Sequence, residues 1–404
     1  MAREEVVILN GARTPMTEWV GGRAGNGKPG GALKDVSAID LGVVAAKAAL
    51  ERSNVPPDLL DHVVMGNALQ TSGDAIYGAR HVALKAGVPV PVPALTVNRL
   101  CGSGIQSIIE AAHLLQLGEA NFVLAGGIEN LSQAPFVVRG ARSGLRLGQG
   151  ALEDSLLTAL KDSFCGLFMA ETSDNLARRY KISREEQDAY AFRSITEGRR
   201  AIDSCLLSEE IVKVTLPGRE AKVVEKDDHC FEGATLEGLA KLQPAFGKES
   251  FVTAGNASGI VDGAAAVVVT TARHAEKRDL KPIGRIASWA VTGIDPDVMG
   301  IGPVPAVRKL LARTGVAVDD IDVVELNEAF ASQSLVVIRE LGLDPEKVNV
   351  SGGAIALGHP LGMSGARLVV SLAHELRRRA GRYGLATLCV GVGQGQAALF
   401  ERYD

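Results

Sequence analysis

Short apolar runs alternate along the chain with longer segments in which alanine, leucine and isoleucine recur at helical spacing. The runs at residues 6–9, 94–97 and 121–125 have the length of strands, and residues 41–52 and 103–117 have the pattern of helices packed on one face. Proline or glycine follows each predicted helix and ends it. Strands that alternate with helices predict an α/β fold in which helices cover the sheets.

The pattern occurs twice, with an offset of 261 residues. Residues 58–64 resemble residues 319–325, and the same offset aligns Ser103-Gly104 with Ser364-Gly365. One such match could arise by chance, but an unchanged offset over separated blocks indicates two homologous halves. We therefore predict a duplicated α/β fold whose halves are each of the βαβαβ type.

The region between the halves differs in composition. It contains more charged and irregular sequence and one predicted helix, at residues 184–202. We interpret it as an inserted loop domain. The predicted domains are an N-terminal half at 1–129, completed by 260–281, the loop domain at 130–259, and a C-terminal half at 282–404.

Composition excludes several classes of protein. Aromatic residues make up 4% of the chain and hydrophobic residues 46%, so the core consists mainly of small aliphatic side chains. The net charge is −4 with both signs interleaved, which argues against a nucleic-acid or membrane-surface protein. No apolar run is long enough to span a membrane, and the acidic start is unlike a signal or transit peptide. Five cysteines without metal-type spacing indicate no metal site and a reducing compartment, for which we expect the cytoplasm.

Three reactive side chains lie in glycine-rich segments. Cys101 follows a predicted strand and precedes a predicted helix, where N–H groups and the helix dipole stabilise a thiolate. The repeat aligns Cys101 with Gly362, so His359 belongs to the equivalent turn of the other half. Cys389 follows the apolar run 385–388. A single free cysteine is more often an inert core residue, but three reactive groups flanked by glycines favour an active site.

The segments around these three residues resemble the signatures of the thiolase family. The resemblance extends over nearly the whole chain and includes residues 253–259, 299–305 and 327–330. Residues 74–81 are most similar to 3-ketoacyl-CoA thiolases of the β-oxidation type. The resemblance implies a layered α/β/α/β/α core and an acyltransferase that acts on acyl-CoA, acetyl-CoA and CoA. It also implies that CoA is a substrate, with no cofactor, and that the protein is a homo-oligomer.

The family mechanism assigns roles to five positions. It implies that His359 takes the proton of Cys101, that Cys101 becomes acylated, and that Cys389 transfers the α-proton of acetyl-CoA. The enolate oxygen would be bound by His359 and a water held by Asn327. The thioester oxygen would be bound by the N–H groups of Cys101 and Gly391.

The resemblance also implies a set of residues that contact CoA or the acyl chain. For the methionines the alternative is ordinary core packing, and for the serine it is a turn residue. The set is Ser258, Ala254, Phe246, Met169, Met299, Ala329, Phe330 and Ile260.

Three positions depart from the family pattern. Phe231 replaces an arginine expected near the CoA phosphates, and Phe168 replaces a histidine of short-chain enzymes. Residues 18–29 are longer than the usual link, and we interpret them as a surface insertion. For the predicted dimer or dimer of dimers, we expect residues 120–125 to be an edge strand that needs covering.

Other functions remain as alternatives. A dedicated acetoacetyl-CoA thiolase would share every catalytic residue. Ketoacyl synthases share the fold but pair their cysteine with His-His or His-Asn, and a cysteine protease would not be duplicated. A non-catalytic acyl-CoA or lipid-binding relative would be expected to lose Cys101, His359 or Cys389, and all three are present.

Overall fold

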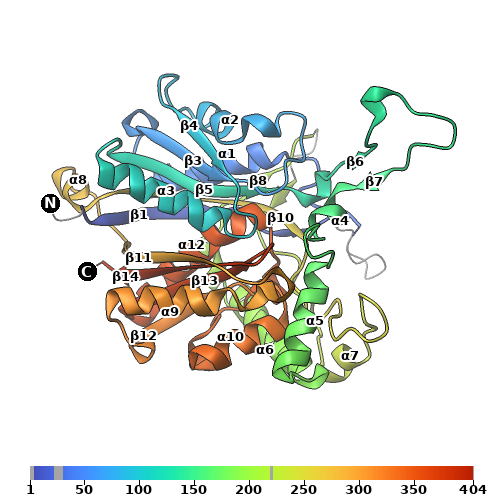
Figure 1. The fold of residues 1–404 in the computed structure, drawn as a ribbon. Helices are drawn as coiled ribbons and strands as arrows, with labels where there is room; N and C mark the ends of the chain where they lie inside the picture. The colour runs from blue at the N-terminus through green and yellow to red at the C-terminus, as the bar shows by residue number, and fades with distance from the viewer. Residues whose placement is uncertain (1–3, 22–30, 219–221, 404) are drawn as a thin grey trace.

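The computed structural model describes residues 4–21, 31–218 and 222–403 (Figure 1). Its core is built from two sets of strands that have the same order and direction. The N-terminal strands are β1 (Val6–Arg13), β3 (His62–Gly66), β4 (Ala94–Val97), β5 (Phe122–Glu129) and β10 (Val261–Thr271). The C-terminal strands are β11 (Gly284–Gly293), β12 (Ile321–Leu326), β13 (Tyr383–Val390) and β14 (Gln394–Arg402).

The strand order is β4-β3-β5-β10-β1-β11-β14-β13-β12. The two halves join where β1 and β11 pair antiparallel over Val7–Arg285 and Ile8–Gly284. In each half parallel strands are followed by antiparallel ones: β4, β3 and β5 are parallel in the N-terminal half, and β12 and β13 are parallel in the C-terminal half. Strands β5 and β13 differ by the predicted offset at both ends. The predicted duplication therefore extends to the register of the strands.

Two central helices lie between the halves. Helices α3 (Ser103–Leu117) and α12 (Leu361–Arg379) contact each other (Figure 1). Helix α3 packs on strands of the N-terminal half, and α12 packs on strands of both halves. They cross at the repeated Ser-Gly pairs, where a Cβ atom on Gly104 would lie 2.3 Å from the backbone nitrogen of Ala366. Glycine is required here because the two backbones touch. Helices α1 (Ala38–Arg52) and α9 (Pro303–Thr314) cover the outer faces, which completes the predicted α/β/α/β/α layering.

The remaining helices lie around this core. Helix α2 (Gly78–Lys85) packs beside α1, α8 (Ala272–Lys277) follows β10, and α10 (Ala331–Leu341) packs beside α9. Where the C-terminal half would repeat β4, it has the short helix α11 (Ala354–Leu357) instead. Among the described residues, no helix combines the length and the apolar character needed to cross a membrane.

Residues 130–259 form short elements outside the large sheet. The helices are α4 (Ser155–Ala159), α5 (Met169–Tyr180), α6 (Arg184–Asp203) and α7 (Leu236–Ala240). Two small ribbons pair β6 (Phe136–Val137) with β7 (Glu153–Asp154) and β8 (Val214–Thr215) with β9 (Val223–Val224), and the first projects from the body (Figure 1). The buried guanidinium of Arg13 binds Asp227 and Glu210 and so holds this region to β1.

Most predicted elements agree with the structure. Residues 94–97 and 103–117 have the predicted bounds, whereas the first strand continues to Arg13. The prediction that residues 120–125 form an edge strand is wrong, because β5 lies between β10 and β3. The crossover after β3 places β4 outside it, and the outermost strands of the sheet are β4 and β12. In the predicted insertion, Thr17–Glu18 form β2 against β10, and residues 22–29 lie outside the described residues.

Candidate active site

Cys101 lies in a tight turn between β4 and α3. The preceding residue, Leu100, has a φ of 48°, a left-handed conformation that costs a leucine about 1–2 kcal/mol. Hydrogen bonds hold it there: Leu100 N donates to Asn98 Oδ1 (2.9 Å), and Ser103 Oγ donates to Leu100 O (2.7 Å). The turn places the thiol at the start of the helix, in partial contact with solvent.

Two backbone N–H groups point at the Cys101 sulfur. They belong to Cys101 itself and to Gly391, which follows β13 in the other half of the molecule. Burial raises the pKa of the thiol to about 11, the charge of Glu129 raises it further, and the two N–H groups oppose the rise. The structure thus brings together the two groups that the sequence assigned to one oxyanion site.

His359 is buried between α11 and α12, and its hydrogen bonds define its tautomer. Its Nδ1 lies 2.5 Å from Ser364 Oγ, and Ser364 Oγ donates its own proton to Pro360 O (2.9 Å). Ser364 must therefore accept from Nδ1–H, which leaves the lone pair on Nε2. That nitrogen lies 3.3 Å from Asn327 Nδ2. Burial and then the charge of Arg367 lower the pKa of His359 to about 3, so the ring is a neutral base.

Cys389 lies within β13 rather than after a strand, and it is buried. Burial and then the neighbouring Cys101 raise the pKa of its thiol, which therefore stays protonated at neutral pH. An apolar cluster surrounds it, and this cluster contains four residues that we assigned to the substrate pocket: Met169, Met299, Ala329 and Phe330. The sulfur of Met169 also lies 3.5 Å from the position of a Cβ atom on Gly391.

The loop domain reaches this cluster through residues 253–260. Ser258 N donates to Ala329 O (3.0 Å), and His359 N donates to Gly259 O (2.8 Å), so Ser258 and Ile260 lie beside the segment that contains His359. Phe246 and Ala254 lie farther out on the exposed surface of the loop domain. The Phe246 ring packs against Phe168, with 5.5 Å between the ring centroids, and Phe168 precedes Met169.

Two buried residues near the site were missed in the sequence. Ser364 sets the histidine tautomer; its match to Ser103 in the repeat was visible, but its contact was not. Glu129 accepts hydrogen bonds from Ala68 N (3.1 Å), Leu69 N (3.1 Å) and Gly362 N (2.7 Å), and burial raises its pKa to about 7. A carboxylate at the end of an apolar strand was the available signal.

This duplicated fold, with two thiols and an imidazole where its halves meet, defines a class of layered α/β protein with thiol chemistry. Family models identify it further. The thiolase N-terminal domain matches residues 6–273, and the thiolase C-terminal domain matches residues 280–402. The chain therefore belongs to the thiolase family.

Individual relatives agree with this assignment. The chain is 49% identical over 398 residues to the human mitochondrial 3-ketoacyl-CoA thiolase, with 98% of each chain covered. The crystal structure of that human enzyme in complex with CoA superposes with a TM-score of 0.94, at 47% identity and with 99% and 98% coverage. The acetyl-CoA acetyltransferase of Bacillus anthracis gives a TM-score of 0.95, at 42% identity over the full length of both chains.

Proposed function

We propose that this protein cleaves 3-ketoacyl-CoA with CoA to give acetyl-CoA and a shortened acyl-CoA, and catalyses the reverse Claisen condensation. The observation that most directly supports the proposal is the surroundings of Cys101: two backbone N–H groups face its sulfur, and Cys389 lies beside it. The neutral His359 in the adjoining turn is a base whose Nε2 keeps its lone pair, 3.3 Å from Asn327 Nδ2, and can accept a proton.

In the cleavage direction, His359 takes the proton of Cys101, and the sulfur attacks the 3-keto carbon. The N–H groups of Cys101 and Gly391 stabilise the oxyanion. The bond between C2 and C3 then breaks, and the acetyl-CoA enolate takes a proton from Cys389. The enolate oxygen accepts from the protonated Nε2 of His359 and from a water held by Asn327, whose Oδ1 has no partner among the described protein atoms and can accept from that water.

The second half-reaction restores the enzyme. The Cys389 thiolate takes the proton of the CoA thiol, and the CoA sulfur attacks the acyl group on Cys101. The thioester bond to Cys101 breaks, and its sulfur regains the proton held by His359. Every proton is returned. Because burial keeps both thiols and the imidazole neutral in the free protein, charge separates only when a substrate carbonyl is present to receive it.

Trapping the acyl-enzyme tests these roles. After brief incubation with acetyl-CoA and an acid quench, peptide mass spectrometry should find the acetyl group on Cys101. The Cys389→Ala variant should still acylate Cys101 but fail to exchange α-protons of acetyl-CoA with deuterium. Cys165→Ala removes a thiol outside the site and serves as the control. Label on Cys389 alone, or exchange at the wild-type rate without it, would contradict the assignment.

For the substrate range we propose short- and medium-chain 3-ketoacyl-CoAs, as in β-oxidation. The support is the apolar wall of Met169, Met299 and Phe330, together with Phe168 in place of a histidine. Each added CH₂ buried in such a wall contributes about 0.8 kcal/mol, so kcat/KM should rise from C4 toward C8. Activity confined to C4 would instead identify a dedicated acetoacetyl-CoA thiolase.

We also propose that the protein is a dimer or a dimer of dimers. The support is the edge strand β4, where Leu95 is 45% exposed, and the projecting β6–β7 hairpin, whose loop exposes Leu147 and Leu152. Light scattering should give a multiple of the 42.3 kDa chain mass; the mass of one chain at micromolar concentration would refute this.

For the compartment we propose the cytoplasm, since both thiols of the site must remain reduced. The human relative is named mitochondrial, so cell fractionation with a matrix marker is the deciding measurement.

A further inference from the structure

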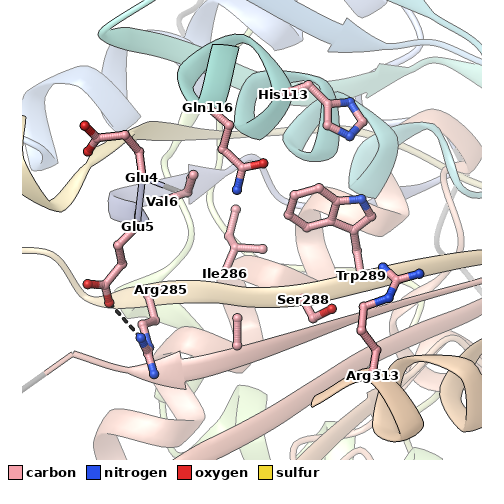
Figure 2. Close-up of a pocket in the computed structure, with 11 residues that line it drawn as sticks. Glu4, Glu5, Val6, His113, Gln116, Arg285, Ile286, Ser288, Trp289 and Arg313 are labelled. Atoms are coloured by element: carbon pink, nitrogen blue, oxygen red, sulfur yellow. Dashed lines mark hydrogen bonds and ion pairs between the residues drawn. The ribbon is translucent and has the colours of Figure 1, made fainter. Parts of the chain in front are cut away.

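A pocket of about 370 Å³ opens where β1 and β11 separate, lined by neither the thiols nor His359 (Figure 2). His113 and Gln116 of α3 line one side, and Trp289 of β11 and Arg313 of α9 line the other. The imidazole of His113 packs edge-on against the indole of Trp289, with 5.4 Å between centroids. Glu5, paired with Arg285, closes the end.

The duplication gives this pocket a counterpart in the other half. Strands β1 and β11 each bulge at the same point, after Ile8 and after Ile286, so Gly11 corresponds to Trp289. At the repeat offset, Arg52 corresponds to Arg313. Arg52 Nη1 donates to Gly11 O (3.1 Å), and Arg313 Nη1 donates to Trp289 O (2.8 Å). The same arginine–carbonyl contact therefore marks equivalent places in the two halves.

In the N-terminal half this place is filled by residues 206–212 of the loop domain. Arg52 donates to two consecutive carbonyls of that segment, Glu210 O (3.0 Å) and Ile211 O (2.9 Å). The segment also pairs with the end of β1, because Arg13 N donates to Glu210 O (2.9 Å) and Val212 N donates to Arg13 O (2.7 Å). Residues 206–209 form a 3-10 turn, after which the chain pairs with the end of β1 through the single parallel bridge between Arg13 and Ile211. One guanidinium, that of Arg52, holds this segment.

In the C-terminal half no backbone segment of the described chain takes this place, and the side chain that reaches it is that of Lys309, whose Nζ donates to Val291 O (3.4 Å). The Arg313 side chain lines the pocket, and among the described residues its one acceptor is Trp289 O and it has no carboxylate partner. A guanidinium carries five N–H donors, so most of them remain available to a ligand. Arg52 donates hydrogen bonds to the carbonyls of residues 210 and 211, and Arg313 can donate in the same way to two carbonyls of another chain.

The side chains around the two places differ in charge. In the filled one, the Glu210 carboxylate accepts from Arg13 Nε (2.7 Å) and Ser371 Oγ (2.8 Å). The positions equivalent to Arg13 and Ser371 are Val291 and Glu110. Glu4 and Glu5 line the open pocket, where they pair with Arg273 and Arg285 at the surface. Arg13, the cationic partner of Glu210, is therefore replaced by the apolar Val291. The open pocket also has carboxylates and an indole face, which suit a cation.

We propose that this pocket binds an extended peptide segment of a partner protein, whose main-chain carbonyls bind Arg313 and whose basic side chain takes the place of Glu210. This mode of recognition is strand addition at a sheet edge, with a charged pocket for one side chain. It is independent of the proposed thiolase activity.

Two labelled peptides test the proposal by fluorescence anisotropy. One copies residues 206–212, and the other replaces both glutamates of that copy by lysine. The lysine peptide should bind about ten-fold more tightly, and Arg313→Gln should weaken it by about ten-fold. Arg377→Gln, at an exposed arginine of α12, is the control. Thiolysis should be unchanged in both variants, which shows that they are folded.

Three results would overturn the proposal. They are no binding of the lysine peptide at millimolar concentration, tighter binding of the glutamate peptide, and equal binding by Arg313→Gln. Free lysine amide is the competitor that distinguishes a peptide site from a small-cation site. If it competes as well as the lysine peptide does, the pocket binds a small cation and not a peptide.

Discussion

The two turns that precede the central helices have the same position in the fold and opposite chemistry. Before α3, the N–H of Cys101 faces its own sulfur. In the first turn of α12, the equivalent residue is Gly362, and its N–H donates to the Glu129 carboxylate at 2.7 Å. One helix start remains available to the developing charge of a reaction, and the other is neutralised by the protein itself. Duplication gives both halves the same backbone arrangement, and the departures from symmetry decide which half carries the proposed nucleophile.

The same contrast holds for the other site residues. At the repeat offset, Asn327 corresponds to Gly66 and Cys389 to Ile128. A Cβ atom on Gly66 would lie 2.6 Å from the backbone of Ser103, so no side chain fits there. Ile128 is buried in the apolar core of the N-terminal half. Packing therefore leaves no room for an asparagine at residue 66, and the position equivalent to Cys389 is filled by an apolar core side chain.

The largest effect on stability should come from the contact between α3 and α12, which holds the two halves together. Gly104→Ala places a methyl group 2.3 Å from the backbone of α12, which neither helix can relieve without moving apart. We expect a loss of at least about 3 kcal/mol in the free energy of unfolding by urea. Gly73→Ala is the matched control, since nothing lies within 4 Å of its Cβ position. Equal stability of the two variants would show that the halves are not locked at this crossing.

The next effect concerns the base in the C-terminal turn. His359→Asn should lower kcat for thiolysis by about 10² to 10⁴. Because the pKa of His359 is lowered to about 3, the ring stays neutral as the pH falls through 6.5, and the wild-type rate of Cys101 acylation should show no acid limb between pH 5 and 8. A limb near pH 6.5 that disappears in the variant would mean that the ring is more hydrated than its burial implies.

The sequence predicted the duplicated fold better than the side-chain contacts within the site. The apolar runs and the constant offset identified the duplication, and the glycines identified Cys101 and Cys389. Sequence could not place Cys389 inside β13 or reveal Glu129, because burial of a carboxylate depends on N–H groups from residues 68, 69 and 362. The edge-strand prediction failed for a related reason: the order of the strands depends on how the whole sheet is assembled and cannot be predicted from the residues of β5 alone.

A smaller effect separates the filled and open peptide sites. Arg52→Gln loses contacts to Gly11, Glu210 and Ile211 and should destabilise the protein by about 2 kcal/mol. Arg313→Gln loses a single carbonyl contact at the surface and should cost about 0.5 kcal/mol or less. Thermal unfolding of both variants gives the difference. Equal losses would mean that the loop segment contributes nothing to the role of Arg52.

The smallest expected effect tests whether Glu129, which accepts from Gly362 N at the start of α12, also influences Cys101 at the start of α3. Glu129 raises the pKa of Cys101, so Glu129→Gln should speed alkylation of Cys101 by iodoacetamide by a few-fold. The pKa of Glu129 is itself raised to about 7, so the difference should be present above pH 7, where the carboxylate is charged, and should fade below it. Glu119→Gln makes the same change of net charge at an exposed position and should leave the rate unaltered. A rate difference that persists at pH 5 would instead mean that glutamine shifts the turn by altering its hydrogen bonds to residues 68, 69 and 362. In that case the two turns would be coupled through geometry and not through charge.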